Sequence, residues 1–98
     1  MGNKWYMDSG RSRHMTGDND LFIDLTPKDG GYVTFRDNIK GKVVEIGTIG
    51  QPQLTTIKNV LLVDGLKHNL FSISQFCDDG FEVIFKQEHY LFLTLILI

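Results

Sequence analysis

The chain has 98 residues, of which 42% are hydrophobic and 22% are charged. This composition is that of a folded protein and excludes an intrinsically disordered segment, and the length allows a single domain, residues 1–98. Ten Lys and Arg against twelve Asp and Glu give a net charge of −2, which lacks the basic surface that nucleic-acid binding requires, so we expect no nucleic-acid partner.

A single cysteine, Cys77, excludes an intramolecular disulfide and leaves too few thiols for a Cys₄ or Cys₂His₂ zinc site.

The first residues lack the apolar core of a secretory signal, and position 6 is Tyr where a myristoylation motif needs Ser or Thr. Residues 91–98 are strongly apolar, but a membrane-spanning helix needs about 17–25 such residues. We therefore expect an intracellular, cytoplasmic protein without a membrane segment. Its apolar end is either a covered strand or the mark of a fragment of a longer chain.

Short apolar segments separated by turn residues predict a mostly β fold. Residues 5–7 form an aromatic strand that ends at the turn-forming triplet Asp8-Ser9-Gly10. The polar residues 17–31 predict a long irregular stretch. Alternating or β-branched segments predict strands at residues 32–35, 42–46, 54–63, 81–85 and 90–98. Within the third of these, the apolar run of residues 60–63 is expected to be buried on both faces.

One short helix is predicted before residue 80. Four residues recur at helical spacing: Leu66, Leu70, Ile73 and Cys77. We expect Asn69 to cap the N-terminus of a helix of about ten residues, residues 78–80 to end it, and Cys77 to be a buried small hydrophobe. The chain as a whole then forms a small, mostly antiparallel barrel with one short helix.

Asp8-Ser9-Gly10 is the triplet most suited to chemistry, because Asp-Ser/Thr-Gly is the active-site signature of aspartic proteases. A carboxylate at a strand end can activate water when it meets a second carboxylate. The small hydroxyl residue holds the loop, and glycine allows the tight turn. Two facing carboxylates share one proton and serve as base and acid in turn. Taken alone, the triplet fits a strand-ending Asx-turn at least as well.

Further segments follow the first, Trp5-Tyr6-Met7-Asp8-Ser9-Gly10, in a consistent order: SRHMTG (12–17), IKNVLLV (57–63), LKHNLFSISQF (66–76) and GFEVIF (80–85). Together they resemble the protease segment of the Pol polyprotein of copia-type LTR retrotransposons, also called the retrovirus-related Pol polyprotein transposon β-barrel domain. The resemblance spans about residues 5–85. It implies a closed, retropepsin-like β-barrel with one short helix that acts as a homodimer.

By this resemblance Asp8 is catalytic, and Ser9 and Gly10 support the active-site loop. The hairpin of residues 32–41 is then a substrate-covering flap with its tip near residues 37–38, and the substrate is an extended peptide of the chain's own polyprotein. The length supports a dimer independently. Only one Asp-Ser-Gly occurs and 98 residues are too few for two lobes, so the second carboxylate must come from a second copy. No cofactor is expected.

Two features depart from the family pattern. Arg11 stands where the family usually has a small residue such as Ala or Cys, and a long cation there would crowd the dimer centre or impair proton sharing. Residues 87–98 resemble the family poorly. The alternative interpretation is therefore a catalytically inactive β-barrel fragment or relic of a transposon Pol polyprotein. An Asp8 side chain beyond the reach of a two-fold mate, or buried beneath Arg11, would exclude the enzyme.

Other candidate sites are weaker. Ser9 or Ser12 with His14 and Asp8 has the residue types of a hydrolase triad, but triad residues usually converge from distant loops. Residues 47–50 are too few for a phosphate-binding loop and lack a following Lys-Ser/Thr. We expect no metal site, because metal-ligand spacing is absent among the three histidines, His14, His68 and His89.

Overall fold

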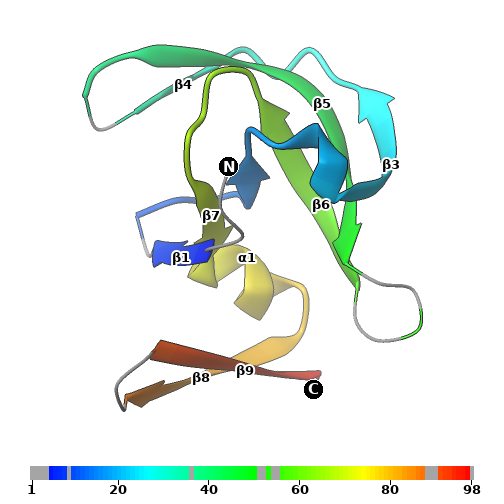
Figure 1. The fold of residues 1–98 in the computed structure, drawn as a ribbon. Helices are drawn as coiled ribbons and strands as arrows, with labels where there is room; N and C mark the ends of the chain where they lie inside the picture. The colour runs from blue at the N-terminus through cyan, green and yellow to red at the C-terminus, as the bar shows by residue number, and fades with distance from the viewer. Residues whose placement is uncertain are drawn as a thin grey trace.

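The computed structural model describes residues 5–8, 10–35, 37–50, 53, 56–87 and 91–97, with side chains up to residue 80. Strands dominate it, and one short helix lies near the C-terminal end of the main sheet (Figure 1). The elements in chain order are β1 (Trp5–Asp8), β2 (Met15–Thr16), the 3₁₀ turn η1 (Asn19–Leu21), β3 (Phe22–Pro27), β4 (Tyr32–Thr34), β5 (Lys40–Gly50), β6 (Thr56–Val63), β7 (Asn69–Ser72), α1 (Ile73–Asp78), β8 (Phe81–Gln87) and β9 (Leu91–Leu97).

The main sheet has the strand order β1-β7-β2-β6-β5-β3, and β4 pairs with the first part of β5. The β1–β7 and β2–β6 pairs are parallel, whereas β7–β2, β6–β5 and β5–β3 are antiparallel. The prediction of a mostly β domain with one short helix is confirmed. The sheet is open, because β1 and β3 remain its two edges within the described residues, so the closed barrel is not confirmed.

A second, two-stranded sheet is formed by β8 and β9, which pair antiparallel. In Figure 1 the helix α1 lies between β7 and this hairpin, which is drawn in orange and red. The strands predicted at residues 81–85 and 90–98 are thus present, although residues 88–90 and 98 lie outside the described part. No helix in the described residues is long and apolar enough to cross a membrane.

The core lies between β2, β5 and β6. Val60, Leu61, Leu62 and Val63 are all buried, which confirms the prediction of a segment covered on both faces. The central cluster contains residues from four parts of the chain: Met15, Val43, Leu61, Val63 and Leu66. Gly41 lies at the edge of this cluster, where a Cβ would come within 2.6 Å of the Asp64 carbonyl oxygen. This close approach fixes the base of the β4–β5 hairpin against the end of β6.

Three local predictions are wrong. Residues 17–31 are not irregular throughout, because they contain η1 and the edge strand β3, which pairs antiparallel with β5. The helix starts at Ile73 with Ser72 as its N-cap, whereas Asn69 lies in β7. Pairing of β7 with β1 and β2 therefore prevails over the helical spacing of its apolar residues. The thiol-bearing Cys77 is exposed and not buried.

Candidate active site

Asp8 is the last residue of β1 and lies opposite Ser72 in the parallel ladder with β7. Its Oδ1 accepts a hydrogen bond of 2.8 Å from the Gly10 backbone N–H, so the strand ends in an Asx-turn. A Cβ at Gly10 would lie 3.2 Å from that same oxygen, a distance that leaves little room for a larger residue. The turn therefore holds one of the two carboxylate oxygens of Asp8 in place. Ser9 lies outside the described residues.

Arg11 forms an ion pair with this carboxylate. Its Nε lies 3.6 Å from Asp8 Oδ2, and the two side chains are 21% and 17% exposed, respectively. Its Nη1 also donates a 3.3 Å hydrogen bond to the Thr34 carbonyl oxygen in β4. Asp8 is therefore partly covered by Arg11 but not sealed from solvent.

The end of β7 and the start of α1 support the turn from behind. The Ser72 hydroxyl donates a 2.7 Å hydrogen bond to the Arg11 carbonyl oxygen, and Ser74 Oγ donates to the same oxygen at 3.3 Å. Ser72 Oγ in turn accepts from the Gln75 backbone N–H at 3.1 Å and so caps the helix. One buried serine thus joins the start of the helix to the turn that follows Asp8.

His14 is fully buried beneath this turn. Its Nδ1 accepts a 2.8 Å hydrogen bond from the Ser72 backbone N–H, and its own backbone N–H donates to Gln75 Oε1, also at 2.8 Å. The ring lies between Phe71 and Phe76, with centroid distances of 5.4 and 4.2 Å. Burial lowers the pKa of His14 from 6.5 to about 4, with Asp79 raising it and Arg13 lowering it to lesser extents.

These contacts give His14 a structural role. Its Nδ1 is occupied by a backbone donor, and its buried Nε2 has no hydrogen-bond partner within the described residues. Ser12 is exposed, whereas the imidazole is buried between two phenyl rings. His14 is therefore not placed to act as the base of a hydrolase triad with Ser12. Ser9 and His89 lie outside the described residues, and His68 packs edge-on against Tyr6 with ring centroids 5.6 Å apart.

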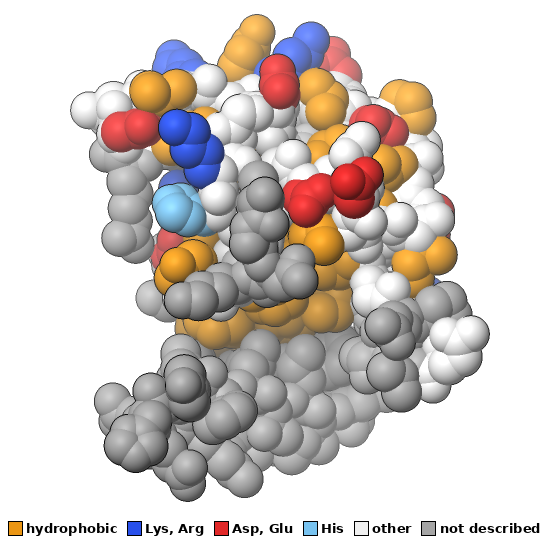
Figure 2. Space-filling view, in the orientation of Figure 1, with side chains coloured by type: hydrophobic (Ala, Val, Ile, Leu, Met, Phe, Trp, Pro, Cys, Tyr) orange, Lys and Arg blue, Asp and Glu red, His pale blue; other side chains and the backbone are white. Residues whose placement is uncertain are grey.

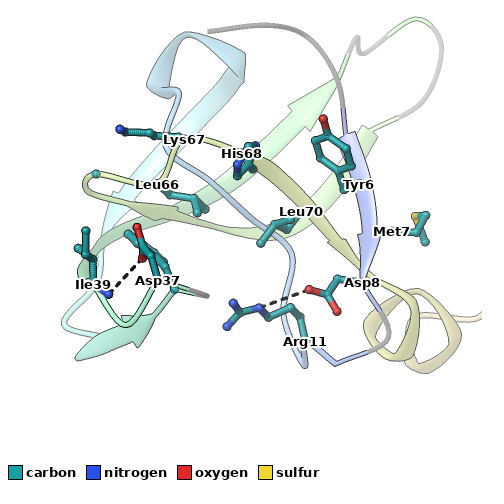
Figure 3. Close-up of a pocket in the computed structure, with 12 residues that line it drawn as sticks. Tyr6, Met7, Asp8, Arg11, Asp37, Ile39, Leu66, Lys67, His68 and Leu70 are labelled. Carbon is teal, nitrogen blue, oxygen red and sulfur yellow. Dashed lines mark hydrogen bonds and ion pairs between the residues drawn. The ribbon is translucent and has the colours of Figure 1, made fainter.

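A pocket of about 670 Å³ opens in front of Asp8. Its wall has three parts: the end of β1 with Arg11, the tip of the β4–β5 hairpin, and the segment that leads from β6 into β7. Figure 3 shows Asp8 and Arg11 at one end of the pocket and Ile39 at the opposite end. The apolar side chains of Leu66 and Leu70 lie between them. The pocket thus combines an acidic group at one end with an apolar floor.

The hairpin that forms one wall lies where the sequence predicts it. β4 pairs with the start of β5, and the turn is closed by hydrogen bonds between Phe35 and Ile39 (2.7 Å) and between Asn38 and Phe35 (3.0 Å). Asn38 has φ +64, a left-handed conformation that Asn adopts more readily than most residues. Asp37 Oδ1 accepts from the Ile39 N–H at 3.1 Å. The tip at residues 37–38 is therefore a turn, and Asp37 and Ile39 beside it line the pocket.

Two further observations concern what the site could bind: the distribution of charged side chains on the surface and the positions of potential metal ligands. Acidic and basic side chains are interspersed with hydrophobic ones on the face drawn in Figure 2. Within the part of the chain that the structure describes, three or more His, Cys, Asp or Glu side chains nowhere converge on a common point that could hold a metal ion. Besides Asp8 and Arg11, the residues with polar side chains that line the pocket are Tyr6, Asp37, Lys67 and His68.

Sequence reasoning missed the residues that hold the turn. Ser72 and Gln75 are buried and connect β7, α1, His14 and the carbonyl of Arg11, and Gln75 Nε2 also donates to the Asn59 carbonyl oxygen at 3.0 Å. The signal was available, because Ser72-x-x-Gln75 has the spacing of a capping box at a helix N-terminus. The contact of Arg11 with Thr34, 23 residues away, has no local signal.

The comparisons with known proteins give one match. The model of the family described as Pol polyprotein, beta-barrel domain, matches residues 5–81. No curated protein and no solved structure matches the chain. The matched range includes all the residues that line the pocket, and also the Ser72 capping residue behind the Asp8 turn. The chain therefore belongs to the family of Pol polyprotein beta-barrel domains.

Proposed function

We propose that this Pol polyprotein domain is one half of an aspartic endopeptidase of a copia-type retrotransposon, with a retropepsin-like fold, and that two copies combine to form the active site. The observation that carries the proposal is the position of Asp8. It ends a strand in an Asx-turn closed by Gly10, and its carboxylate faces a pocket whose opposite wall is a hairpin.

The proposed reaction is hydrolysis of a peptide bond by water. One ionised Asp8 takes a proton from the attacking water while the protonated partner's Asp8 donates its proton to the carbonyl oxygen, which gives a neutral gem-diol. A carboxyl group then protonates the leaving nitrogen as the C–N bond breaks. The carboxylate accepts a proton from the gem-diol and the pair returns to its starting state. No cofactor enters this cycle.

A pair is needed because one carboxylate cannot be base and acid at the same moment. Two carboxylates at close range share one proton, since both cannot remain charged beside each other. A two-fold dimer brings the second copy of Asp8 to the first without further sequence. The partial exposure of the Asp8 side chain, 17%, is compatible with such an approach.

The proposed substrate is an extended segment of the chain's own polyprotein. Leu66, Leu70 and Ile39 give the pocket apolar walls, which would favour hydrophobic side chains next to the cleaved bond. A peptide in extended conformation would hydrogen-bond to the hairpin by strand addition. The hairpin would then serve as the flap.

Cleavage by the purified chain tests the proposal. We expect hydrolysis of polyprotein-derived peptides at mildly acidic pH, and inhibition by a statine-type transition-state analogue that mimics the gem-diol. Because the active species is a dimer, activity per chain should fall when the protein is diluted below the dimer dissociation constant. Cleavage that is insensitive to the analogue and proportional to concentration throughout would contradict the proposal.

The second candidate is an inactive domain, and the ion pair between Arg11 and Asp8 favours it. A guanidinium beside the carboxylate balances the charge that the reaction would use. Sedimentation distinguishes the two. A stable monomer that cleaves nothing, and that gains no activity when Arg11 is replaced, would identify the inactive domain.

A further inference from the structure

Arg11 connects two parts of the molecule that an endopeptidase must separate. Its Nε lies 3.6 Å from Asp8 Oδ2, and its Nη1 donates to the Thr34 carbonyl oxygen at 3.3 Å. In Figure 3 the guanidinium extends from the Asp8 end of the pocket toward the hairpin. The side chain thus lines the pocket and connects the acidic turn to β4.

The backbone of Arg11 is held firmly, so this bridge does not arise from a loosely placed surface side chain. The Arg11 carbonyl oxygen accepts hydrogen bonds from the hydroxyls of Ser72 and Ser74 at 2.7 and 3.3 Å. The Arg11 N–H donates to the Asp8 carbonyl oxygen at 3.4 Å. The side chain starts from a fixed point and is only 21% exposed, so solvent screens its charge less than it screens a free surface cation.

The bridge opposes the proposed reaction in two ways. A substrate strand between Asp8 and the hairpin would need the space and the Thr34 carbonyl that Arg11 now occupies. In a dimer, two guanidinium groups would also balance two carboxylates, which removes the repulsion that makes the pair share one proton. Binding of substrate and formation of the acid–base pair therefore both require Arg11 to leave.

We propose that Arg11 is an autoinhibitory latch that ties the Asp8 turn to the β4–β5 hairpin and is released when a substrate peptide enters. This inference rests on the proposed endopeptidase function and concerns the regulation of the same site. A latch at this position would keep the half-site closed until two copies and a substrate come together.

Arg11→Ala tests the latch by two readouts. We expect kcat/KM for peptide cleavage to rise about tenfold, equivalent to about 1.4 kcal/mol, because substrate no longer has to displace the ion pair. We also expect faster hydrogen exchange at the amides of Phe35 and Asn38 in the hairpin turn. Raising the salt concentration to about 1 M should narrow the difference in activity between the two proteins, because salt weakens the ion pair only where Arg11 is present.

Arg13→Ala is the matched control, since it removes a cation from the same loop at a position outside the pocket lining. It should leave both cleavage and hairpin exchange unchanged. If Arg11→Ala cleaves peptide at the wild-type rate or more slowly, the latch is overturned but the proposed endopeptidase activity is not. Unchanged hydrogen exchange in the hairpin would have the same consequence. Absence of cleavage in both the wild type and Arg11→Ala overturns the endopeptidase, and the latch with it.

Discussion

Asp8→Asn is expected to lower kcat/KM for peptide cleavage by about 10²–10⁴-fold, the range that a positioned acid–base group contributes. Asparagine keeps the side-chain oxygen that accepts from the Gly10 N–H, so the Asx-turn and the end of β1 should persist. The amide, however, cannot take a proton from water at the pH of the assay. The loss should therefore appear in kcat, with unfolding midpoints close to those of the wild type.

Asp18→Asn provides the matched control for this change. Asp18 is the N-cap of η1, where its Oδ1 accepts from the Asp20 N–H at 3.0 Å, and Asn can cap in the same way. It does not line the pocket. We expect full activity from Asp18→Asn. Activity that survives in Asp8→Asn would remove Asp8 from the reaction.

Acidification is expected to destabilise the fold through His14. Burial holds the pKa of His14 at about 4 in the folded protein, against 6.5 in the unfolded chain, so the unfolded chain takes up the proton first as the pH falls. The stability that neutral His14 contributes is therefore fully present above about pH 6.5 and is lost progressively as the pH falls toward 4. The His14 contribution to this loss between about pH 8 and about pH 5 amounts to about 2 kcal/mol, measurable by urea unfolding across that range.

His14→Asn separates this effect from the titration of carboxylates. The Asn oxygen can accept from the Ser72 N–H as Nδ1 does, but it does not titrate. The variant should be less stable at about pH 8, because it loses ring contacts with Phe76, yet its stability should change less on acidification. His68→Asn, at an exposed position, should keep the wild-type slope. A wild-type slope in His14→Asn would contradict the assignment.

The position of the catalytic candidate could be predicted because its determinants are local. An aromatic strand, a carboxylate and a glycine two residues later are sufficient to define β1 and the Asx-turn. The hairpin at residues 32–41 was predictable for a similar reason, since alternating residues flank a turn that Asn38 tolerates. These features depend on neighbouring residues alone.

The features that sequence reasoning missed depend on distant partners. The apolar spacing that begins at Leu66 predicts a helix from Asn69, but residues 69–72 find hydrogen-bonding partners in β1 and β2 and become a strand. The edge strand β3, FIDLTP, lacks a regular alternation of apolar and polar residues, and it becomes a strand by pairing with β5. Whether the sheet closes depends on its two edges, β1 and β3, which no local pattern relates to each other.

Mixing the wild type with Asp8→Asn tests most directly the claim that two copies of Asp8 form one active site. At constant total protein, with time for subunits to exchange, a one-to-one mixture contains about one quarter wild-type homodimers if association is random. The account predicts that activity falls to about a quarter of that of the wild type. A decrease only to about half, as for independent monomers, would contradict it.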